Sequence, residues 1–231
     1  MRPRALRYRT GNVRRVIHRT AEAARCIGPL APGDRVTGVT AGQFSAIDAM
    51  EHICAELGPA AVRISTWTTG LYDVHRAKAI RTRGRITDIR MLLDRGTFEK
   101  SPKYAGPLIE ALGIDAFRCL SVHAKVIVVT GERGAAAFRS SMNLNKNLRT
   151  EQFDLDVCPD VAEFYRSWFD ALWDEAGRSQ DNRAIIAAVY DRFRSEPAEA
   201  PEGSKRERRP ASRVSRPCDM SFSAADLDGL V

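Results

Sequence analysis

The chain of 231 residues is 44% hydrophobic, which is enough to bury the core of one sizeable domain. No stretch approaches the roughly 18 consecutive apolar residues of a membrane-spanning helix, and the first residues lack the apolar segment of a signal peptide. The net charge of +7 and the pI near 9.4 point to an anionic partner, nucleic acid first and an acidic membrane surface second. Charge alone leaves open the alternative that arginines only decorate a soluble surface.

The first half of the chain alternates helical and strand patterns. Residues 12–27 have the apolar spacing of a helix, residues 34–40 are typical of a short strand, and residues 43–57 again predict a helix. Strands are expected next over 60–69 and 85–94, each ended by turn-forming residues. This alternation of strands with helices predicts an α/β fold with a sheet that helices cover on both faces.

The second half of the chain adds a strand over 151–157 and a helix over 160–176. In that helix Phe164, Trp168 and Leu172 recur on one stripe. Such a stripe is more typical of a helix that faces the core than of a binding surface.

Composition divides the chain into three parts. Residues 1–30 form a basic N-terminal arm and the first helix, and the first 19 of them carry seven arginines and no acidic residue. Residues 31–195 form the folded domain. Residues 196–231 have little to bury and predict a disordered basic linker that ends in a short acidic and apolar tail. The tail is either an unstructured end or a peptide that docks on a partner.

Cysteine usage indicates the compartment. The five cysteines are odd in number, scattered, and contain no C-x-x-C pair; they are Cys26, Cys54, Cys119, Cys158 and Cys218. This pattern favours reduced thiols over disulfides or a zinc site. We therefore expect a cytoplasmic protein that uses no metal and no cofactor.

A β-hairpin is the simplest structure for the stretch between the strands at 85–94 and 151–157. Gly131 and Gly134 supply a turn between two apolar runs, and folding the runs about this turn brings His123 opposite Met142. The hairpin therefore places groups that are 19 residues apart in the sequence beside each other.

Four polar groups converge in this hairpin. His123 and Lys125 project from the same face because strand side chains alternate, and Ser141 and Asn143 flank them from the second run. The set suits a phosphate, with the Lys125 charge and two hydrogen-bond donors on its oxygens and a histidine that attacks or transfers protons. With four histidines and six lysines in the chain, a chance H-x-K is expected only about 0.1 times, which argues against ordinary residues on a wet strand face.

The residues from His123 to Glu151 resemble the H-x-K-x4-D and G-S-x-N signature of the phospholipase D superfamily, in particular its small single-motif members, nucleases among them. The resemblance implies a mixed β-sheet flanked by helices on both faces, with the catalytic domain over 31–195. It implies a catalytic site formed by His123, Lys125, Ser141, Asn143 and Glu151. In that site Lys125, Ser141 and Asn143 would bind the substrate phosphate, and Glu151 would orient the histidine.

The chain departs from the signature at two positions. Thr130 stands where the motif has aspartate, and Ser140 stands where it has the glycine of G-S-x-N. Tyrosyl-DNA phosphodiesterases, another branch of the superfamily, also lack this aspartate and remain active. Asp154 is an alternative to Glu151, because both lie on the predicted strand over 151–157.

The single motif predicts a homodimer. Enzymes of this superfamily use two motif histidines, one to attack phosphorus and one to protonate the leaving oxygen. His18 and His52 lie on predicted helices, and His75 has no accompanying S-x-N. The second half-site is therefore expected from a second subunit across a two-fold axis.

The sequence thus predicts a metal-independent phosphodiesterase that acts on DNA or RNA through a phosphohistidine. The alternatives are a nucleic-acid-binding protein with little or no turnover and an enzyme directed at phospholipids. Clustered arginines favour nucleic acid, because contacts with the phosphate backbone need clustered cations.

Overall fold

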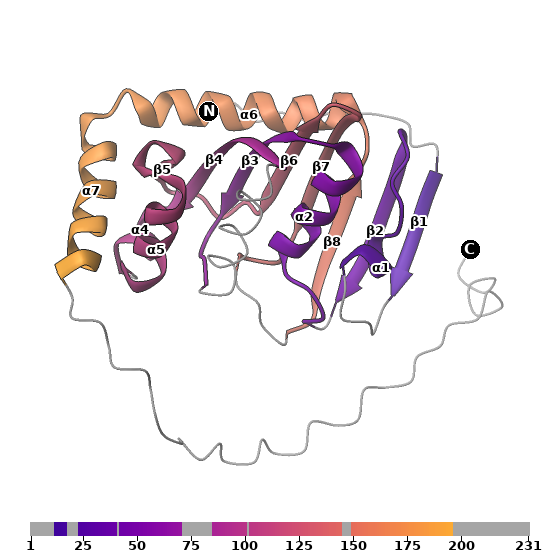
Figure 1. The fold of residues 1–231 in the computed structure, drawn as a ribbon, viewed down its shortest axis with the longest axis horizontal. Coiled ribbons are helices and arrows are strands. Elements are labelled where there is room, and N and C mark those ends of the chain that lie inside the picture. Colours follow the sequence, from indigo (N-terminus) through magenta and orange to yellow (C-terminus); the bar gives the residue numbers. More distant parts are fainter. Residues whose placement is uncertain are drawn as a thin grey trace, which may run out of the picture. The chain divides into compact units, whose positions relative to one another are not determined.

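The computed structural model describes residues 12–17, 23–40, 42–70, 85–100, 102–144 and 149–195. Its strands are β1 (Asn12–Ile17), β2 (Asp34–Thr40), β3 (Ala60–Thr66), β4 (Ile86–Asp94), β5 (Phe117–Leu120), β6 (Val126–Gly131), β7 (Gly134–Ser140) and β8 (Glu151–Asp156). Within this part of the chain they form one sheet in the order β1-β2-β8-β7-β6-β3-β4-β5 (Figure 1). The four central pairs, β2–β8, β8–β7, β7–β6 and β6–β3, are antiparallel. The outer pairs, β1–β2, β3–β4 and β4–β5, are parallel.

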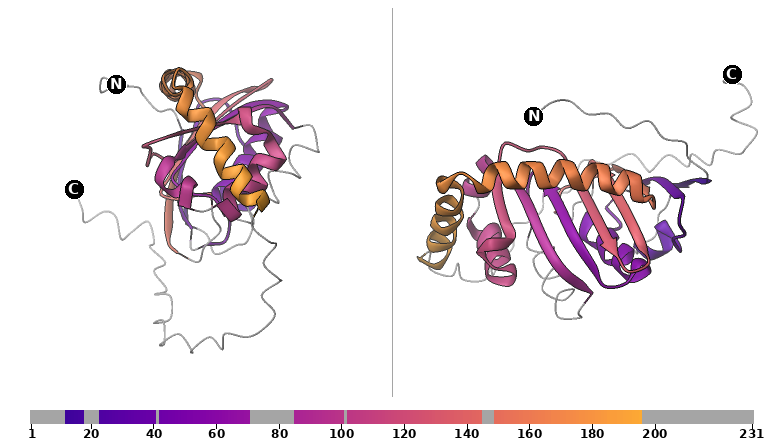
Figure 2. Two further views of the ribbon diagram at one scale, coloured as in Figure 1. Left: turned by 90° about the vertical axis from the view of Figure 1, so that its left-hand side faces the viewer. Right: turned by 90° about the horizontal axis from the view of Figure 1, so that it is seen from above.

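Helices lie on both faces of this sheet. They are α1 (Ala23–Ile27), α2 (Ala46–Leu57), α4 (Arg95–Lys100), α5 (Pro102–Leu112), α6 (Pro159–Gly177) and α7 (Gln180–Ser195), with a 3-10 turn η1 (Ile114–Ala116). On β6, Ile127 and Val129 join the core under α2, whereas Val126 and Val128 pack with Ala162 of α6. Figure 2 shows α6 running across the strands on one side of the sheet. The alternation of strand side chains therefore places buried residues on both faces, and the predicted mixed α/β fold is confirmed.

The helix predicted over 12–27 is wrong in its first half. Asn12–Ile17 is strand β1, which pairs in parallel with β2, and only Ala23–Ile27 is helical. Short apolar runs fit either period, and here the unpaired backbone groups at the edge of β2 decide in favour of a strand.

The predicted core stripe of α6 lies one position from the observed one. Phe169 and Trp173 are buried against the sheet, whereas Trp168 and Leu172 are half-buried beside them and Phe164 is half-buried as well. The helix carries large apolar residues on two neighbouring stripes about 100° apart, so its spacing alone does not say which stripe faces the sheet.

The sequence patterns predicted no element over residues 95–120 or over the last helix. In the structure these residues form α4, α5, β5 and α7. Asn182 of α7 is buried, and its side chain accepts the N–H of Cys119 at 3.1 Å and donates to the Cys119 carbonyl at 2.5 Å. Asn182 thus satisfies both backbone polar groups of Cys119 on the edge strand β5. These two hydrogen bonds join α7 to β5.

The β6–β7 hairpin has the predicted turn, and its tip caps a helix. Gly131 pairs with Gly134 around a two-residue loop. The Arg133 backbone N–H donates to the Leu57 carbonyl at 2.9 Å, and its guanidinium donates to the carbonyls of Glu56 and Ala55 at 2.8 and 2.9 Å. These are the carbonyls that the end of α2 leaves without helical partners. The turn is therefore joined to α2 by both the backbone N–H and the guanidinium of Arg133.

This close approach predicts a stability effect. A Cβ at Gly131 would lie 2.5 Å from the Leu57 carbonyl oxygen, so backbone must move in Gly131→Ala. We expect a loss of about 1–3 kcal/mol in the free energy of unfolding, measured by chemical denaturation. Gly96→Ala is the matched control, because its Cβ would meet nothing nearer than 3.5 Å and alanine favours a helix. Equal stability of the two variants would contradict the contact.

Two further expectations concern the termini and membranes. The basic arm up to residue 11 and the linker and tail over 196–231 lie outside the described residues, so both remain predictions. Among the helices that the structure describes, none has the length and apolarity to cross a membrane.

Candidate active site

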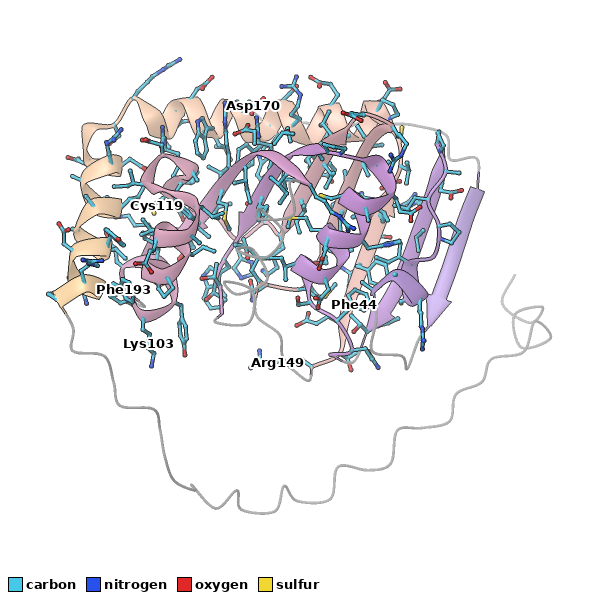
Figure 3. All side chains as sticks on the ribbon, viewed as in Figure 1. Phe44, Lys103, Cys119, Arg149, Asp170 and Phe193 are labelled. Carbon is cyan, nitrogen blue, oxygen red and sulfur yellow. The ribbon has the colours of Figure 1, made fainter. Side chains whose placement is uncertain are left out.

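The polar residues singled out from the sequence lie at one end of the sheet. There β3 and β7 end and β6 and β8 begin, with Ser65 of β3 in register with Val126 of β6. Glu151, the first residue of β8, is in register with Thr40, the last residue of β2. This is the lower end of the sheet in Figure 1, and Arg149, which precedes β8, is labelled there in Figure 3.

The register of the hairpin agrees with the predicted pairing. Val126 pairs with Arg139, and one position further the Ser140 N–H donates to the Lys125 carbonyl at 3.2 Å. Continuing this register places His123 opposite Met142, as expected. The strand itself begins at Val126, so His123 and Lys125 lie in the extended segment before β6 and not within the strand.

His123 and Lys125 lie together on this segment. The Lys125 ammonium is 3.4 Å from Nδ1 of His123 and donates to the His123 carbonyl at 3.1 Å. The segment is anchored by Ser65, a buried residue whose hydroxyl donates to the Ala124 carbonyl at 2.8 Å. Partial burial lowers the pKa of Lys125, and the negative charge of Glu151 acts in the opposite direction. An ammonium with reduced hydration attracts an anion more strongly than a fully solvated one.

Ser141 and Glu151 are joined by a hydrogen bond from the Ser141 hydroxyl to the Glu151 carboxylate. The same hydroxyl accepts the Gln152 N–H at 3.0 Å. No hydrogen bond joins Glu151 to His123 in the part of the chain that is described. The structure therefore brings Glu151 into the site through Ser141, and the predicted orientation of the histidine by Glu151 remains a prediction.

Asn143 lies beside the chain that follows β3. The N–H of its neighbour Leu144 donates to the Thr68 carbonyl at 3.2 Å, and Thr69 bridges to Leu144. Oδ1 of Asn143 is buried and has no hydrogen-bond partner within the described ranges. A phosphodiester has no hydrogen-bond donor, so the predicted phosphate contact of Asn143 requires its amide NH₂ group and remains a prediction.

The two acidic candidates on β8 have different surroundings. Asp154 accepts the Thr37 hydroxyl at 2.7 Å, across the β2–β8 pair. Glu151 lies three residues away, and strand alternation directs the two side chains to opposite faces. Only Glu151 reaches the Ser141 hydroxyl, so Asp154 is the weaker candidate.

Thr130 lies far from the rest of the motif. It is exposed at the other end of β6, beside the turn, and pairs with Ala61 and Ala135. Seven residues of extended chain separate it from His123 by roughly 23 Å. The residue in the place of the motif aspartate therefore does not contact the candidate site.

This distance predicts that changes at Thr130 are nearly silent. Thr130→Asp and Thr130→Val are expected to keep phosphodiesterase activity within about twofold of wild type and to change the free energy of unfolding by less than about 0.5 kcal/mol. Steady-state rates and denaturation curves measure both effects. A gain of more than tenfold in Thr130→Asp would show that the missing charge limits catalysis despite its distance.

Local hydrogen bonds account for Ser140, the other departure from the signature, and for His52. The Ser140 hydroxyl accepts the N–H of Met142 at 3.1 Å, so serine fits the turn where the motif has glycine. Nε2 of His52 is 2.7 Å from the Gly28 carbonyl, which ties α2 to the end of α1. His18 and His75 lie outside the described residues.

Trp67 is the site residue that the sequence reasoning missed. Its ring centroid is 5.4 Å from that of His123, with the planes tilted by 49°. The strand predicted over 60–69 ends at Thr66, which places Trp67 just beyond the end of β3. The run of polar residues after the strand was the available signal, because it marks the point where the strand leaves the sheet.

Comparison of the chain with protein-family models and with curated proteins finds no match. Among solved structures, Nuc from Salmonella typhimurium, a phospholipase D family member, is similar with 16% identity and a TM-score of 0.45 over 61% of this chain and 93% of that chain. NucT from Helicobacter pylori gives 15% identity and a TM-score of 0.45 over 61% and 96%. TrmBL2, an archaeal chromatin protein with a novel mode of DNA binding, gives 13% identity and a TM-score of 0.41 over 61% and 53%.

Proposed function

We propose that this protein is a metal-independent phosphodiesterase of the phospholipase D type that cleaves nucleic acid in the cytoplasm. One observation carries the proposal. His123, Lys125 and the Ser141–Glu151 pair come from segments up to 28 residues apart and meet at one end of the sheet. A nucleophile, a positive charge and a carboxylate at one place are the groups that displacement at phosphorus requires.

In the proposed reaction an imidazole nitrogen of His123 attacks phosphorus and forms a P–N bond. The ester oxygen leaves with the electrons of its P–O bond and takes a proton from a second imidazole. Water then attacks phosphorus, the P–N electrons return to His123, and the second imidazole takes the proton of the water. Lys125 stabilises the negative charge that develops on the phosphoryl oxygens.

The second imidazole is proposed to come from a second copy of the chain. Within the described part, the other histidine is His52 of α2, whose ring is bonded to the carbonyl of Gly28 after α1. Two-fold symmetry would place the partner subunit's His123 on the opposite side of one phosphate. The proposed assembly is therefore a homodimer with one composite site.

The dimer predicts that an inactive chain inhibits an active one. When wild type is held constant and allowed to exchange subunits with a tenfold excess of His123→Ala, most wild-type chains enter heterodimers with a single imidazole, and activity falls by roughly tenfold. Rates are measured with substrate in large excess over total protein, so that the variant does not sequester it. Unchanged activity per wild-type chain, or a monomer in sedimentation at the assay concentration, would refute the composite site.

The function is tested directly by incubating the purified protein with labelled single-stranded DNA, double-stranded DNA and RNA in EDTA. We expect cleavage of at least one of these polymers at a rate that EDTA does not change. Cleavage that requires added Mg²⁺ would overturn the proposed chemistry.

Binding without turnover is the second candidate, and one observation favours it. The Glu151 carboxylate accepts a hydrogen bond from Ser141 and none from His123, so within the described residues no acid orients the imidazole. In that case the protein would bind nucleic acid in EDTA or Mg²⁺ and leave every phosphodiester intact.

A further inference from the structure

Trp67 is unusual among the apolar residues of the described ranges because it is exposed. Its side chain is 41% accessible, and the other large exposed apolar residue in that part of the chain is Val39 at 37%. The indole also lies against His123, with ring centroids 5.4 Å apart. An exposed indole beside a candidate nucleophile offers an aromatic face to whatever adjoins the reacting phosphate.

The backbone around Trp67 is held in place on both sides. The Thr66 hydroxyl donates to the Thr68 carbonyl at 3.1 Å, and the same carbonyl accepts the N–H of Leu144 at 3.2 Å. Thr69 bridges to Leu144 as well. The backbone that carries the indole is therefore tied to the segment that ends at Leu144, and a ligand that stacks on the indole has less ordering to impose.

A narrow hollow lies between Trp67 and the helices α4 and α5, and its volume of about 10 Å³ has room for one water but not for a nucleobase. Its walls include Trp67, Thr68, Leu93, Asp94, Phe98 and Tyr104. The ammonium of Lys103 lies 5.4 Å from the centre of the Tyr104 ring, and the Lys103 side chain is exposed at the lower side of the molecule in Figure 3. The aromatic surface open to a ligand is therefore the exposed face of Trp67, and Lys103 places a cation beside Tyr104 in the wall of the hollow.

We propose that the exposed face of Trp67 stacks on an unpaired nucleobase of the nucleotide that flanks the phosphate held by Lys125 and His123. This inference rests on the proposed function, and it names the substrate class as single-stranded nucleic acid or an unpaired end. A base in a duplex has both faces covered by its neighbours, so only an unpaired base offers a face to the indole. Lys103 would contact the backbone of the same strand, as a cation does along a single-strand groove.

The test measures binding in the His123→Ala background, where the oligonucleotide is not cleaved. Three ligands of equal length are compared, namely a single-stranded oligonucleotide, the same strand with abasic sugars and equal charge, and a duplex of that strand with about twice the charge. Each variant is compared with its parent on the same ligand, so the charge of the duplex does not enter the ratio. Trp67→Ala is expected to weaken binding of the single strand by about 5- to 150-fold, and to leave binding of the abasic strand and the duplex unchanged. Trp67→Phe is expected to recover part of the loss, because it keeps an aromatic face.

Two controls separate this inference from the proposed function. Val39→Ala removes the other exposed apolar side chain and is expected to bind all three ligands like its parent. Lys125→Ala is expected to weaken the base-bearing and abasic strands by the same factor, because it acts on phosphate. If Lys125→Ala binds all ligands normally, the phosphate site fails and the proposed function with it.

Lys125→Ala can behave as expected while Trp67→Ala weakens binding of the base-bearing and abasic strands by the same factor, or weakens binding of neither strand. Either result refutes the base site and leaves the proposed function standing. Vesicles of anionic phospholipid provide the last arm. A loss of vesicle binding in Trp67→Ala without a loss of oligonucleotide binding would overturn the base site in favour of a lipid surface.

Discussion

His123→Ala is expected to reduce phosphodiester cleavage by at least about 10⁴-fold, because it removes the group that forms the covalent bond to phosphorus. The measurement is the initial rate of oligonucleotide cleavage in EDTA. Affinity for the oligonucleotide is expected to change little, since Lys125 and its contact with the His123 backbone carbonyl do not require the imidazole.

His52→Gln is the matched control for this experiment. His52 of α2 bonds to the carbonyl of Gly28, which follows α1, and a glutamine amide can still donate to that oxygen. Its activity is expected to equal that of wild type. Persistent cleavage in His123→Ala would show that another group attacks phosphorus.

Lys125→Ala is expected to lower kcat by about 10²- to 10³-fold, because the ammonium stabilises the charge that develops on the phosphoryl oxygens. Binding of oligonucleotides should weaken as well, since the same charge attracts the substrate. Steady-state kinetics and direct binding measure the two effects separately. A full rate with weaker binding would mean that Lys125 only attracts the substrate.

The same lysine predicts a pH dependence. Partial burial lowers the pKa of Lys125 relative to an ordinary lysine, although the charge of Glu151 opposes the shift. The charged form binds phosphate, so affinity should fall as the pH rises through this lowered pKa, at a lower pH than for an exposed lysine. Lys125→Arg keeps its charge throughout that range, and its affinity is expected to lack the alkaline decrease. An identical alkaline decrease in both proteins would assign it to another group.

The sequence located the hairpin and its register because both depend on local chemistry. The glycines at the turn allow a tight connection, and once the turn is placed, every cross-strand pair follows from it. Thus His123 opposite Met142 was predictable, and the observed pairing of Val126 with Arg139 continues to it.

Local sequence patterns did not predict two other features of the fold. The α6 stripe was assigned one position off, since two neighbouring stripes are apolar and only the sheet selects Phe169 and Trp173. Residues 12–17 became a strand because the edge of β2 was available for pairing. In both cases the deciding partner is distant in the chain, and no pattern within the segment contains it.

By itself the sequence determined the α/β class, the hairpin, and the identity of His123, Lys125, Ser141, Asn143 and Glu151 as the candidate groups. Only the tertiary structure decided how they are used, because that depends on which strand ends share one end of the sheet. It brought Trp67 beside His123 and joined Glu151 to Ser141. It also placed Thr130 at the opposite end of β6, since an extended strand separates its two ends by the rise of every residue between them.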